Sequence, residues 1–215
     1  MRPPNTRTNL FHFYTVDDLR TLLPGRWLIE QILEQPAVGC LFGPSGGGKT
    51  FVALDLLLSV VTGQSWHGHA VTQGTGIYVV AEGSRGILKR VQAWQRHHHC
   101  QTVSNAFFLL EAVQLRPRDQ VRRLLRTIMA EGLTPALIVF DTFAQCFVGG
   151  EENSAKDVGE AVAAVRWLSN ETGAGPSFRT CEPGYRAREQ RVAGQCRCHA
   201  LSSDNPGGRG HDQEH

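Results

Sequence analysis

The sequence predicts an α/β fold with a mostly parallel sheet. From Phe11 to Ala174, short apolar runs alternate with stretches of helical periodicity, which is typical of strand–helix–strand units. The glycine-rich segment GPSGGGKT stands between one such run and an apolar helix, and a later run ends in Asp141. In a parallel sheet these segments meet at the carboxyl ends of the strands, where ligands bind.

The expected elements follow one another along the chain. Residues 1–36 are expected to form an N-terminal extension that packs on the core, and residues 37–174 are expected to form the core itself. The predicted strands are Ala37–Phe42, Gly76–Ala81, Ala106–Leu110 and Ala136–Asp141. A buried helix is predicted over Lys49–Thr62, with Gly63 as its C-cap.

Two amphipathic helices are predicted from apolar residues that recur at helical spacing. The first stripe consists of Val121, Leu124, Leu125, Ile128 and Met129, and it ends at Gly132. The second consists of Val158, Ala161, Val162, Val165 and Leu168, before Gly173. Each stripe gives its helix one face that packs on the sheet.

The composition excludes several classes of protein. With 41% hydrophobic and 20% charged residues, the 215-residue chain is unlike collagen-like and highly charged disordered proteins. No apolar run approaches the roughly 18 residues of a membrane-spanning helix, and the start MRPPNTRTN lacks the apolar stretch of a secretory signal. We therefore expect a cytoplasmic protein without a membrane partner. The net charge of +2 does not by itself indicate nucleic acid.

The cysteine, histidine and arginine clusters have structural interpretations. The six cysteines are expected to be free thiols. The neighbours in His97–Cys100 point in different directions at a helix end, so we expect no metal other than Mg²⁺. The basic segment Arg116–Arg126 is interpreted as a solvated helix face, with DNA contact as the alternative.

A phosphate-binding loop is the strongest signal in the chain. Its residues match G-x-x-x-x-G-K-[ST] and are predicted to bind ATP: Gly43, Pro44, Ser45, Gly46, Gly47, Gly48, Lys49 and Thr50. The glycines let successive backbone N–H groups face one anion, Lys49 reaches the β- and γ-phosphates, and the hydroxyl of Thr50 ligates Mg²⁺. The alternative is a glycine-rich turn that only caps a helix, but the motif stands in register with both its strand and its helix.

Two carboxylates are predicted at the same edge of the sheet. Asp141 follows five apolar residues, so it is the predicted second metal ligand; the alternative is an aspartate that starts a turn. Glu82 ends the strand of YVVAEG and is a candidate base for the attacking water. Its alternative role is a favourable charge at a helix N-terminus.

The motifs together resemble a known family. The AEG strand end, its spacing from GPSGGGKT, the LIVFDT strand and the following EENSAKD resemble the RepA-type hexameric replicative helicases, a RecA-like branch of P-loop ATPases also called AAA family ATPases. The resemblance runs from about Arg26 to Ala174. It implies a RecA-like P-loop NTPase core, ATP and Mg²⁺ as cofactors, a homo-hexamer, single-stranded DNA as a partner and a role in plasmid- or phage-type DNA replication. It also implies that Glu82 is catalytic and that Arg90 faces the nucleotide.

The chain departs from this family after Ala174. The family continues with an apolar strand ending in paired histidines and then with a loop, in a context like SRGS, that carries an arginine finger. Here the segment Gly175–Arg179 reads GPSFR, so we expect a sheet that is incomplete at its C-terminal end. Without the finger and the sensor histidine, ATP hydrolysis is expected to be impaired.

Residues 175–215 are expected to be a disordered tail or an out-of-frame translation. They contain only Phe178, Val192 and Leu201 from the set Val, Leu, Ile, Met and Phe, against six Gly and six Arg. Permitted codons for Arg186–Ala200, read from the second base, give GHESSGSRGSAAAMR, which resembles the missing arginine loop. A frameshift near codon 175 accounts for the changed composition.

Three functions are compared. The first is an Mg-ATP-binding ATPase resembling RepA-type DNA helicases, with impaired hydrolysis in this form. The alternative is a non-catalytic nucleotide-binding remnant without helicase activity. A small-molecule P-loop kinase is disfavoured, because no arginine-rich lid stands between the predicted strands.

Overall fold

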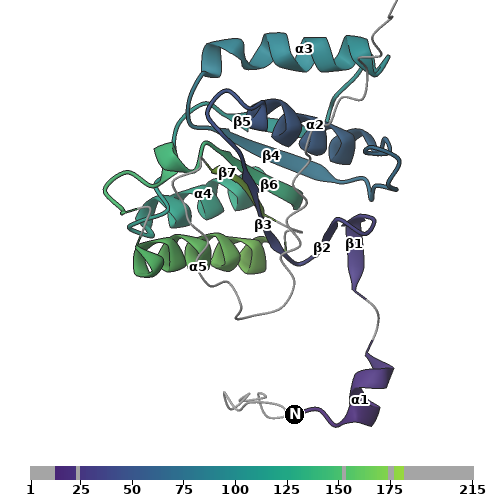
Figure 1. Cartoon of the computed structure of the whole chain (residues 1–215), viewed down its shortest axis with the longest axis vertical. Coiled ribbons are helices and arrows are strands. Elements are labelled where there is room, and N and C mark those ends of the chain that lie inside the picture. Colours follow the sequence, from purple (N-terminus) through teal and green to yellow (C-terminus); the bar gives the residue numbers. More distant parts are fainter. Residues whose placement is uncertain (1–12, 23–24, 152–153, 174–176, 182–215) are drawn as a thin grey trace, which may run out of the picture.

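A five-stranded, fully parallel sheet forms the centre of the protein (Figure 1). The computed structural model describes residues 13–22, 25–151, 154–173 and 177–181. The sheet has the order β3-β7-β6-β4-β5. Its strands are β3 (Val38–Phe42), β4 (Thr75–Val80), β5 (Ala106–Leu109), β6 (Pro135–Asp141) and β7 (Ser177–Cys181). The predicted α/β class with a parallel sheet is confirmed.

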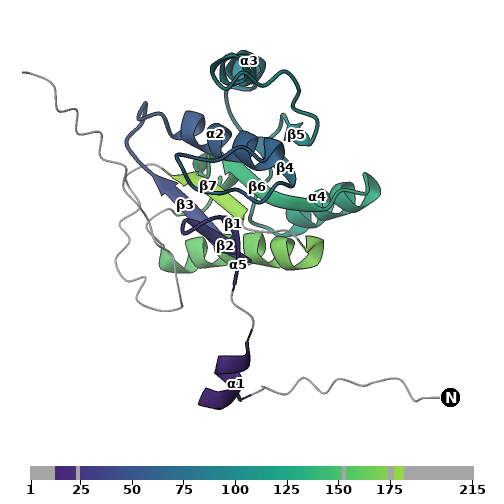
Figure 2. The same cartoon turned by 90° about the vertical axis from the view of Figure 1, so that its right-hand side faces the viewer.

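Helices cover both faces of the sheet, as Figures 1 and 2 show. The helices are α2 (Lys49–Thr62), α3 (Ile87–His97), α4 (Asp119–Ala130) and α5 (Ala155–Thr172), with short 3₁₀ turns η1 (Ser84–Gly86) and η2 (Ala144–Cys146). Helix α2 packs on β4, β6 and β7, and α3 lies outside α2. Helices α4 and α5 pack together on the opposite face.

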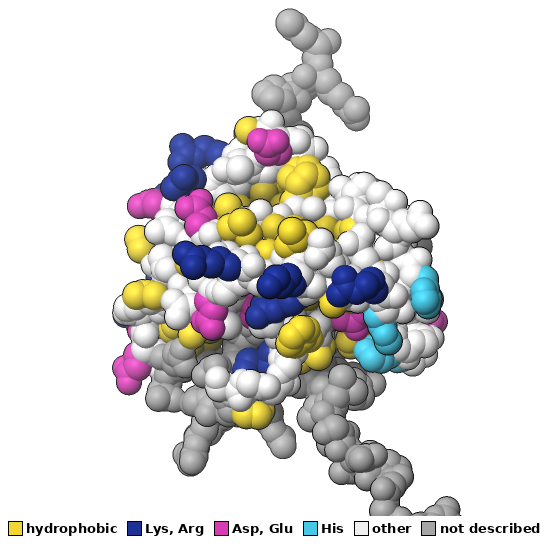
Figure 3. All heavy atoms as spheres, turned by 90° about the horizontal axis from the view of Figure 1, so that it is seen from above, with side chains coloured by type: hydrophobic (Ala, Val, Ile, Leu, Met, Phe, Trp, Pro, Cys, Tyr) yellow, Lys and Arg dark blue, Asp and Glu magenta, His cyan; other side chains and the backbone are white. Residues whose placement is uncertain are grey.

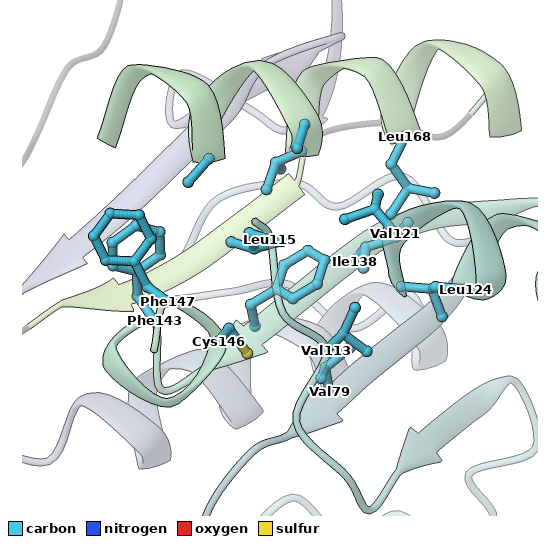
Figure 4. Packing of buried hydrophobic residues seen from close by; sticks show 14 of the residues in the cluster. Val79, Val113, Leu115, Val121, Leu124, Ile138, Phe143, Cys146, Phe147 and Leu168 are labelled. Atoms are coloured by element: carbon cyan, nitrogen blue, oxygen red, sulfur yellow. The ribbon is translucent and has the colours of Figure 1, made fainter. Parts of the chain in front are cut away.

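Each face of the sheet has its own hydrophobic core. Alternate residues of β6 serve the two cores: Ile138 and Phe140 pack towards α4 and α5, and Leu137 and Val139 pack towards α2. Figure 4 shows the first core, where Leu115, Phe143 and Phe147 from the connecting loops join residues of α4 and α5. A strand buried on both faces reads as a continuous apolar run, which is why β6 was predictable.

The predicted helices and strands agree closely with the structure. Helix α2 begins at Lys49 and ends before Gly63, whose φ of 72° is the left-handed conformation of a glycine C-cap. In α4, four residues of the predicted stripe are buried, but Met129 is 64% exposed, so its place in that stripe was wrong. At 100° per residue, Met129 lies about 80° from Val121 around the helix, beyond Leu125 at about 40°, and so falls outside the buried face.

The central position of β7 corrects the expectation of a missing strand after Ala174. Ser177–Cys181 pairs with β3 on one side and with β6 on the other, in parallel. The polar composition of this segment had argued against a strand. Because β7 lies between two other strands, the expected exposed edge at this place in the sheet is wrong. The remainder of the expected tail, residues 182–215, lies outside the described residues.

The N-terminal extension divides into two parts. The strands β1 (Arg26–Ile29) and β2 (Leu33–Gln35) form an antiparallel pair, and Leu28, Ile29 and Leu33 join the core beneath α2. Helix α1 (Val16–Thr21) starts at a capping box on Thr15 and has no buried residue. Packing on the core is therefore a property of β1 and β2.

One carboxylate joins α3 to α2. Asp55 of α2 accepts hydrogen bonds from the indole of Trp66 at 2.8 Å and the indole of Trp94 at 2.7 Å. The Nε2 atoms of His67 and His98 each lie 3.5 Å from its oxygens. Trp66 is itself buried, with 7% of its surface exposed. In the described part of the chain, no helix is both long and apolar enough to cross a membrane.

Candidate functional site

The glycine-rich loop connects the end of β3 to the start of α2. Gly46 and Gly48 have φ angles of 75° and 78°, and nothing lies within 4 Å of where a Cβ would stand on either residue. The left-handed backbone, rather than lack of space, therefore selects glycine at these two positions. The loop ends at the N-terminus of a 14-residue helix, where unpaired N–H groups and the helix dipole favour an anion.

Lys49 lies inside this loop. Its ammonium donates to the carbonyl oxygens of Gly43 and Pro44, both at 2.9 Å, and the residue is only 9% exposed. No described carboxylate forms an ion pair with it. A buried cation bound only by carbonyl oxygens has strong unused electrostatic attraction for an anion.

Asp141 ends β6 beside the loop and is held by two hydroxyl groups. Tyr78 donates to its Oδ2 at 2.8 Å, and Thr180 donates to its Oδ1 through a short bond. The carboxylate is 4% exposed, while Tyr78 and Thr180 are fully buried. Each oxygen of a carboxylate has two acceptor positions, so both retain one for another donor or a cation.

Tyr78 links this carboxylate to the glycine-rich loop. Its hydroxyl lies 3.5 Å from the carbonyl oxygen of Thr50, as well as 2.8 Å from Asp141. Burial, and then the negative charge and hydrogen bond of Asp141, raise the pKa of Tyr78 far above its ordinary value. The phenol therefore stays protonated, donates to the carboxylate and keeps it beside the first turn of α2.

Glu82 is placed next to Asp141 by the register of the sheet. Val80 pairs with Asp141 across β4 and β6, and the N–H of Ala81 donates to the Asp141 carbonyl at 2.7 Å. Glu82 then lies opposite Thr142, whose hydroxyl is 3.4 Å from its Oε2. Unlike Asp141, Glu82 is exposed. A solvent-accessible carboxylate at this position can reach a water molecule above the loop.

Arg90 comes from α3 and lies over the start of α2. Its guanidinium lies 5.5 Å from the centre of the Phe51 ring and next to Gly83 and Gly86. It also lowers the pKa of Tyr78, the smallest of the four influences on that group, so its positive charge acts within the site. The structure thus brings Arg90 to the same edge of the sheet as Glu82 and Thr50.

Two residues of the site were not predicted from the sequence. In the sequence, Tyr78 stands within an apolar strand, and Thr180 lies in a segment that is expected to be a tail. The polar tip of Tyr78 inside the run IYVV was the available signal, since a buried tyrosine hydroxyl needs a partner. For Thr180 the sequence offers no comparable signal.

The residues of this edge fit a nucleotide with a divalent cation. The loop offers backbone N–H groups and the ammonium of Lys49 to phosphate oxygens. The hydroxyl of Thr50 and the carboxylate of Asp141 are oxygen ligands of the kind that Mg²⁺ prefers. Glu82 and Arg90 add a negative and a positive group near that edge.

Comparisons with known proteins bear on the family of the chain. A family model described as an AAA domain matches residues 4–176. Comparison with curated proteins gives no match. Among solved structures, the KaiC-like protein PH0186 from Pyrococcus horikoshii OT3 is similar with a TM-score of 0.46 and 17% sequence identity. That similarity covers 72% of this chain and 65% of the other, so the chain spans less than two thirds of that protein's length.

The family match contains every residue of the site except Thr180. It includes the strand, glycine-rich loop and helix of the phosphate site, as well as the ends of β4 and β6. It also covers most of the chain. The sequence match and the parallel α/β sheet lead to one conclusion: the chain belongs to the AAA domain family of nucleotide-binding P-loop ATPases.

Proposed function

We propose that the chain binds Mg-ATP and is an ATPase related to the RepA-type DNA helicases, with slow hydrolysis in this form. One observation carries the proposal: the glycine-rich loop with Lys49, the buried Asp141 and the exposed Glu82 converge at the carboxyl edge of one parallel sheet. Family membership supports nucleotide binding. The specific roles given below to the residues are part of the proposal.

In this proposal each residue has a distinct task. Backbone N–H groups of the loop and the ammonium of Lys49 hold the β- and γ-phosphates. The hydroxyl of Thr50 and the carboxylate of Asp141 hold Mg²⁺, which neutralises charge on the phosphate oxygens when it is bound. Tyr78 and Thr180 orient Asp141 by their hydrogen bonds.

Glu82 is the proposed base that orients the attacking water. Its exposed carboxylate lies beside Thr142 and Asp141 without being buried among donors, so it can exchange a proton with water. Arg90 is proposed to bind the nucleotide, because its guanidinium reaches from α3 to the loop after β4. The negative charge that Glu82 brings near the phosphates is offset in part by Arg90 and Lys49.

The proposed slow hydrolysis follows from the sequence after residue 174. After residue 174 the encoded frame contains no arginine in a context like SRGS, and such a finger typically contributes about 10³–10⁵ in rate. Because Ser177–Cys181 forms the central strand β7 as encoded, the proposed frameshift is placed after residue 181 rather than near codon 175. The intact protein would then be a homo-hexameric ATPase that acts on single-stranded DNA during plasmid- or phage-type replication.

ATP binding and hydrolysis are measured separately to test this function. We expect a fluorescent ATP analogue to bind the full chain in the presence of Mg²⁺, and phosphate release to be slow. Glu82→Gln should retain binding and lower the remaining hydrolysis rate by about 100-fold or more, within the range of general-base catalysis. Glu131→Gln, a change of the same kind at an exposed residue of the α4 C-cap, should change neither. Absence of ATP binding to the folded chain would refute the proposal.

The second candidate function is a non-catalytic nucleotide-binding remnant. The missing arginine loop is the observation that favours it. Resequencing of the coding DNA across codons 165–215 and expression of a chain with the frame restored distinguish the two. A rise in hydrolysis of about 10³-fold or more in the restored chain supports the ATPase with a lost finger. A confirmed frame with bound but unhydrolysed ATP supports the remnant.

A further inference from the structure

The first turn of α2 presents an exposed aromatic ring beside the glycine-rich loop. Of residues 49–54, Phe51 alone is exposed, at 60%, and the other five are buried or half-buried. Phe51 follows Thr50 directly, so it stands where the phosphate-binding segment ends. Its N–H donates to the carbonyl oxygen of Gly48 at 2.9 Å, which ties its backbone to the loop. The ring thus has a fixed attachment and an open surface.

Helix geometry directs this side chain towards the loop. The Cα–Cβ bonds of an α-helix tilt towards its N-terminus, and the N-terminus of α2 adjoins the glycine-rich loop. In the proposed complex the loop holds the phosphates, with the γ-phosphate next to Glu82. The ribose and base are attached at the other end of the triphosphate, so they need a surface just outside the loop. Phe51 offers such a surface where α2 begins.

The guanidinium of Arg90 adds a second planar group at the same place. It lies 5.5 Å from the centre of the Phe51 ring, within the range of a cation–π contact. Arg90 is half-buried, and none of the described carboxylates forms an ion pair with it. Aromatic rings and guanidinium planes are the groups on which nucleobases stack. Figure 3 looks onto the α3 side of the molecule and shows hydrophobic side chains exposed next to Lys and Arg side chains.

The packing of α3 on α2 does not depend on Phe51. Ile87 and Trp94 of α3 are buried in the core, and the Trp94 indole donates to Asp55 of α2 at 2.7 Å. These contacts fix the inner side of α3. A ring that is 60% exposed adds little buried apolar area to the fold. Its open surface is therefore available to a ligand.

We propose that Phe51, with Arg90 beside it, is the stacking surface for the base of the nucleotide and makes the site selective for purine nucleoside triphosphates. This inference rests on the proposed ATP binding and extends it, because a loop that contacts only phosphates does not distinguish one base from another. A phenyl ring carries no hydrogen-bonding group, so it favours bases by their stacked area. Purines have two fused rings and pyrimidines have one, so purines stack on it more strongly.

A second copy of the chain is the other candidate to cover this ring. An interface between copies would bury the guanidinium of Arg90 together with Phe51, although no described carboxylate of the same chain pairs with that charge. A nucleotide carries a planar base and negative phosphates in one molecule. It therefore matches the ring and the cation at the same time.

The test compares ATP with inorganic tripolyphosphate, which has the phosphates but no base. Calorimetric titrations in the presence of Mg²⁺ give the affinity of the full chain for each ligand. We expect Phe51→Ala to weaken ATP binding by about 5- to 150-fold, the range for loss of one base–aromatic stack, and to leave tripolyphosphate binding unchanged. Phe13→Ala, the same change at a residue that is 90% exposed and precedes α1, should alter neither affinity.

Phe51→Trp keeps a stacking surface and should bind ATP as the parent chain does. CTP should bind the parent chain more weakly than ATP, and this difference should shrink in Phe51→Ala. Unchanged ATP affinity in Phe51→Ala, or an equal loss for ATP and tripolyphosphate, would overturn the proposal. So would a lower molecular mass of Phe51→Ala by light scattering without nucleotide, which indicates that a second copy covers the ring. Binding of neither ligand to the parent chain would instead refute the proposed ATP binding itself.

Discussion

The glycine-rich loop and the carboxylate at the end of β6 lie at the same edge of the sheet but are built in different ways. The loop is held by its own backbone: Lys49 donates to the carbonyl oxygens of Gly43 and Pro44, six and five residues away respectively. Asp141 is held by side chains distant in sequence, namely Tyr78, 63 residues before it, and Thr180, 39 residues after it.

The glycine-rich loop is the phosphate half of the site, and Asp141 with its partners is the carboxylate half. The difference in their contacts explains how far the structure of each half depends on the rest of the chain. A loop whose contacts are local needs only its strand and helix to form. A buried carboxylate that depends on partners from two other strands forms only when the sheet is assembled in the correct order. The phosphate half of the site is thus a local structure, and the carboxylate half is a product of the tertiary fold.

The largest expected effect comes from removal of β7, which joins the two halves. Strand β3 pairs only with β7 within the described sheet, so a chain that ends at residue 174 separates the P-loop strand from β6. We expect this chain to lose cooperative unfolding in urea and to lose nucleotide binding. A chain that ends at residue 185 retains all of β7 and should unfold cooperatively. Cooperative unfolding of both chains would show that β7 is dispensable.

Lys49→Ala disrupts only the phosphate half of the site, which is held by contacts within the glycine-rich loop. The ammonium makes charge-assisted hydrogen bonds to phosphate in the proposed complex, each worth about 1.5–3 kcal/mol, so two bonds predict a loss of at least about 100-fold in affinity for the ATP analogue. Folding should be preserved, because the lysine contacts only loop carbonyls. Lys156→Ala, at an exposed position of α5, is the matched control and should bind normally.

Asp141→Ala tests the carboxylate half of the site, which depends on contacts between different strands. It leaves the buried hydroxyls of Tyr78 and Thr180 without their acceptor, which predicts a loss of about 2 kcal/mol in the free energy of unfolding, measured by urea denaturation. Asp141→Asn keeps an acceptor of the same shape and should lose less stability while still weakening Mg²⁺-dependent binding. If both variants are as stable as the parent chain, these hydrogen bonds do not support the fold.

The smallest expected effect concerns Cys146, which lies in the core near Asp141. Burial raises the pKa of this thiol to about 11. The raised pKa makes a contribution to the free energy of unfolding that changes with pH. This contribution is complete below pH 9 and is lost as the pH rises towards 11, because only the unfolded thiol ionises in that interval. At pH 8, iodoacetamide should label Cys146 more slowly than the partly exposed Cys40 and Cys100, with peptide mass mapping as the readout. Equal labelling in the native chain would show that the α4–α5 core opens readily.

The predictability of the site follows the same division between local and distant contacts. The P-loop, its strand and its helix could be predicted because every requirement lies within Val38–Thr62. Asp141 and Glu82 could be predicted as strand ends, since an apolar run followed by a carboxylate is a local pattern. The hydrogen bonds of Tyr78 and Thr180 could not, because they depend on strand order.

Strand β7 and the hydrogen bonds of Asp55 could likewise not be predicted from the sequence, because both depend on contacts between segments far apart in the chain. The segment 177–181 has few apolar residues, and its strand conformation comes from pairing with β3 and β6 rather than from its own propensity. That Trp66 and Trp94 share the acceptor Asp55 could not be predicted from the sequence. Asp55 and Trp94 are 39 residues apart and meet only through the packing of α3 on α2.

The Asp55 cluster gives the protein an intrinsic optical reporter. Two of its four tryptophans, Trp66 and Trp94, donate to the same carboxylate, and that carboxylate belongs to the helix that begins at Lys49. Any shift of α2 relative to α3 changes the surroundings of both indoles at once. The fluorescence emission of Trp66 and Trp94 therefore reports on the contact between α3 and α2, the helix that begins at the glycine-rich loop, without an added label.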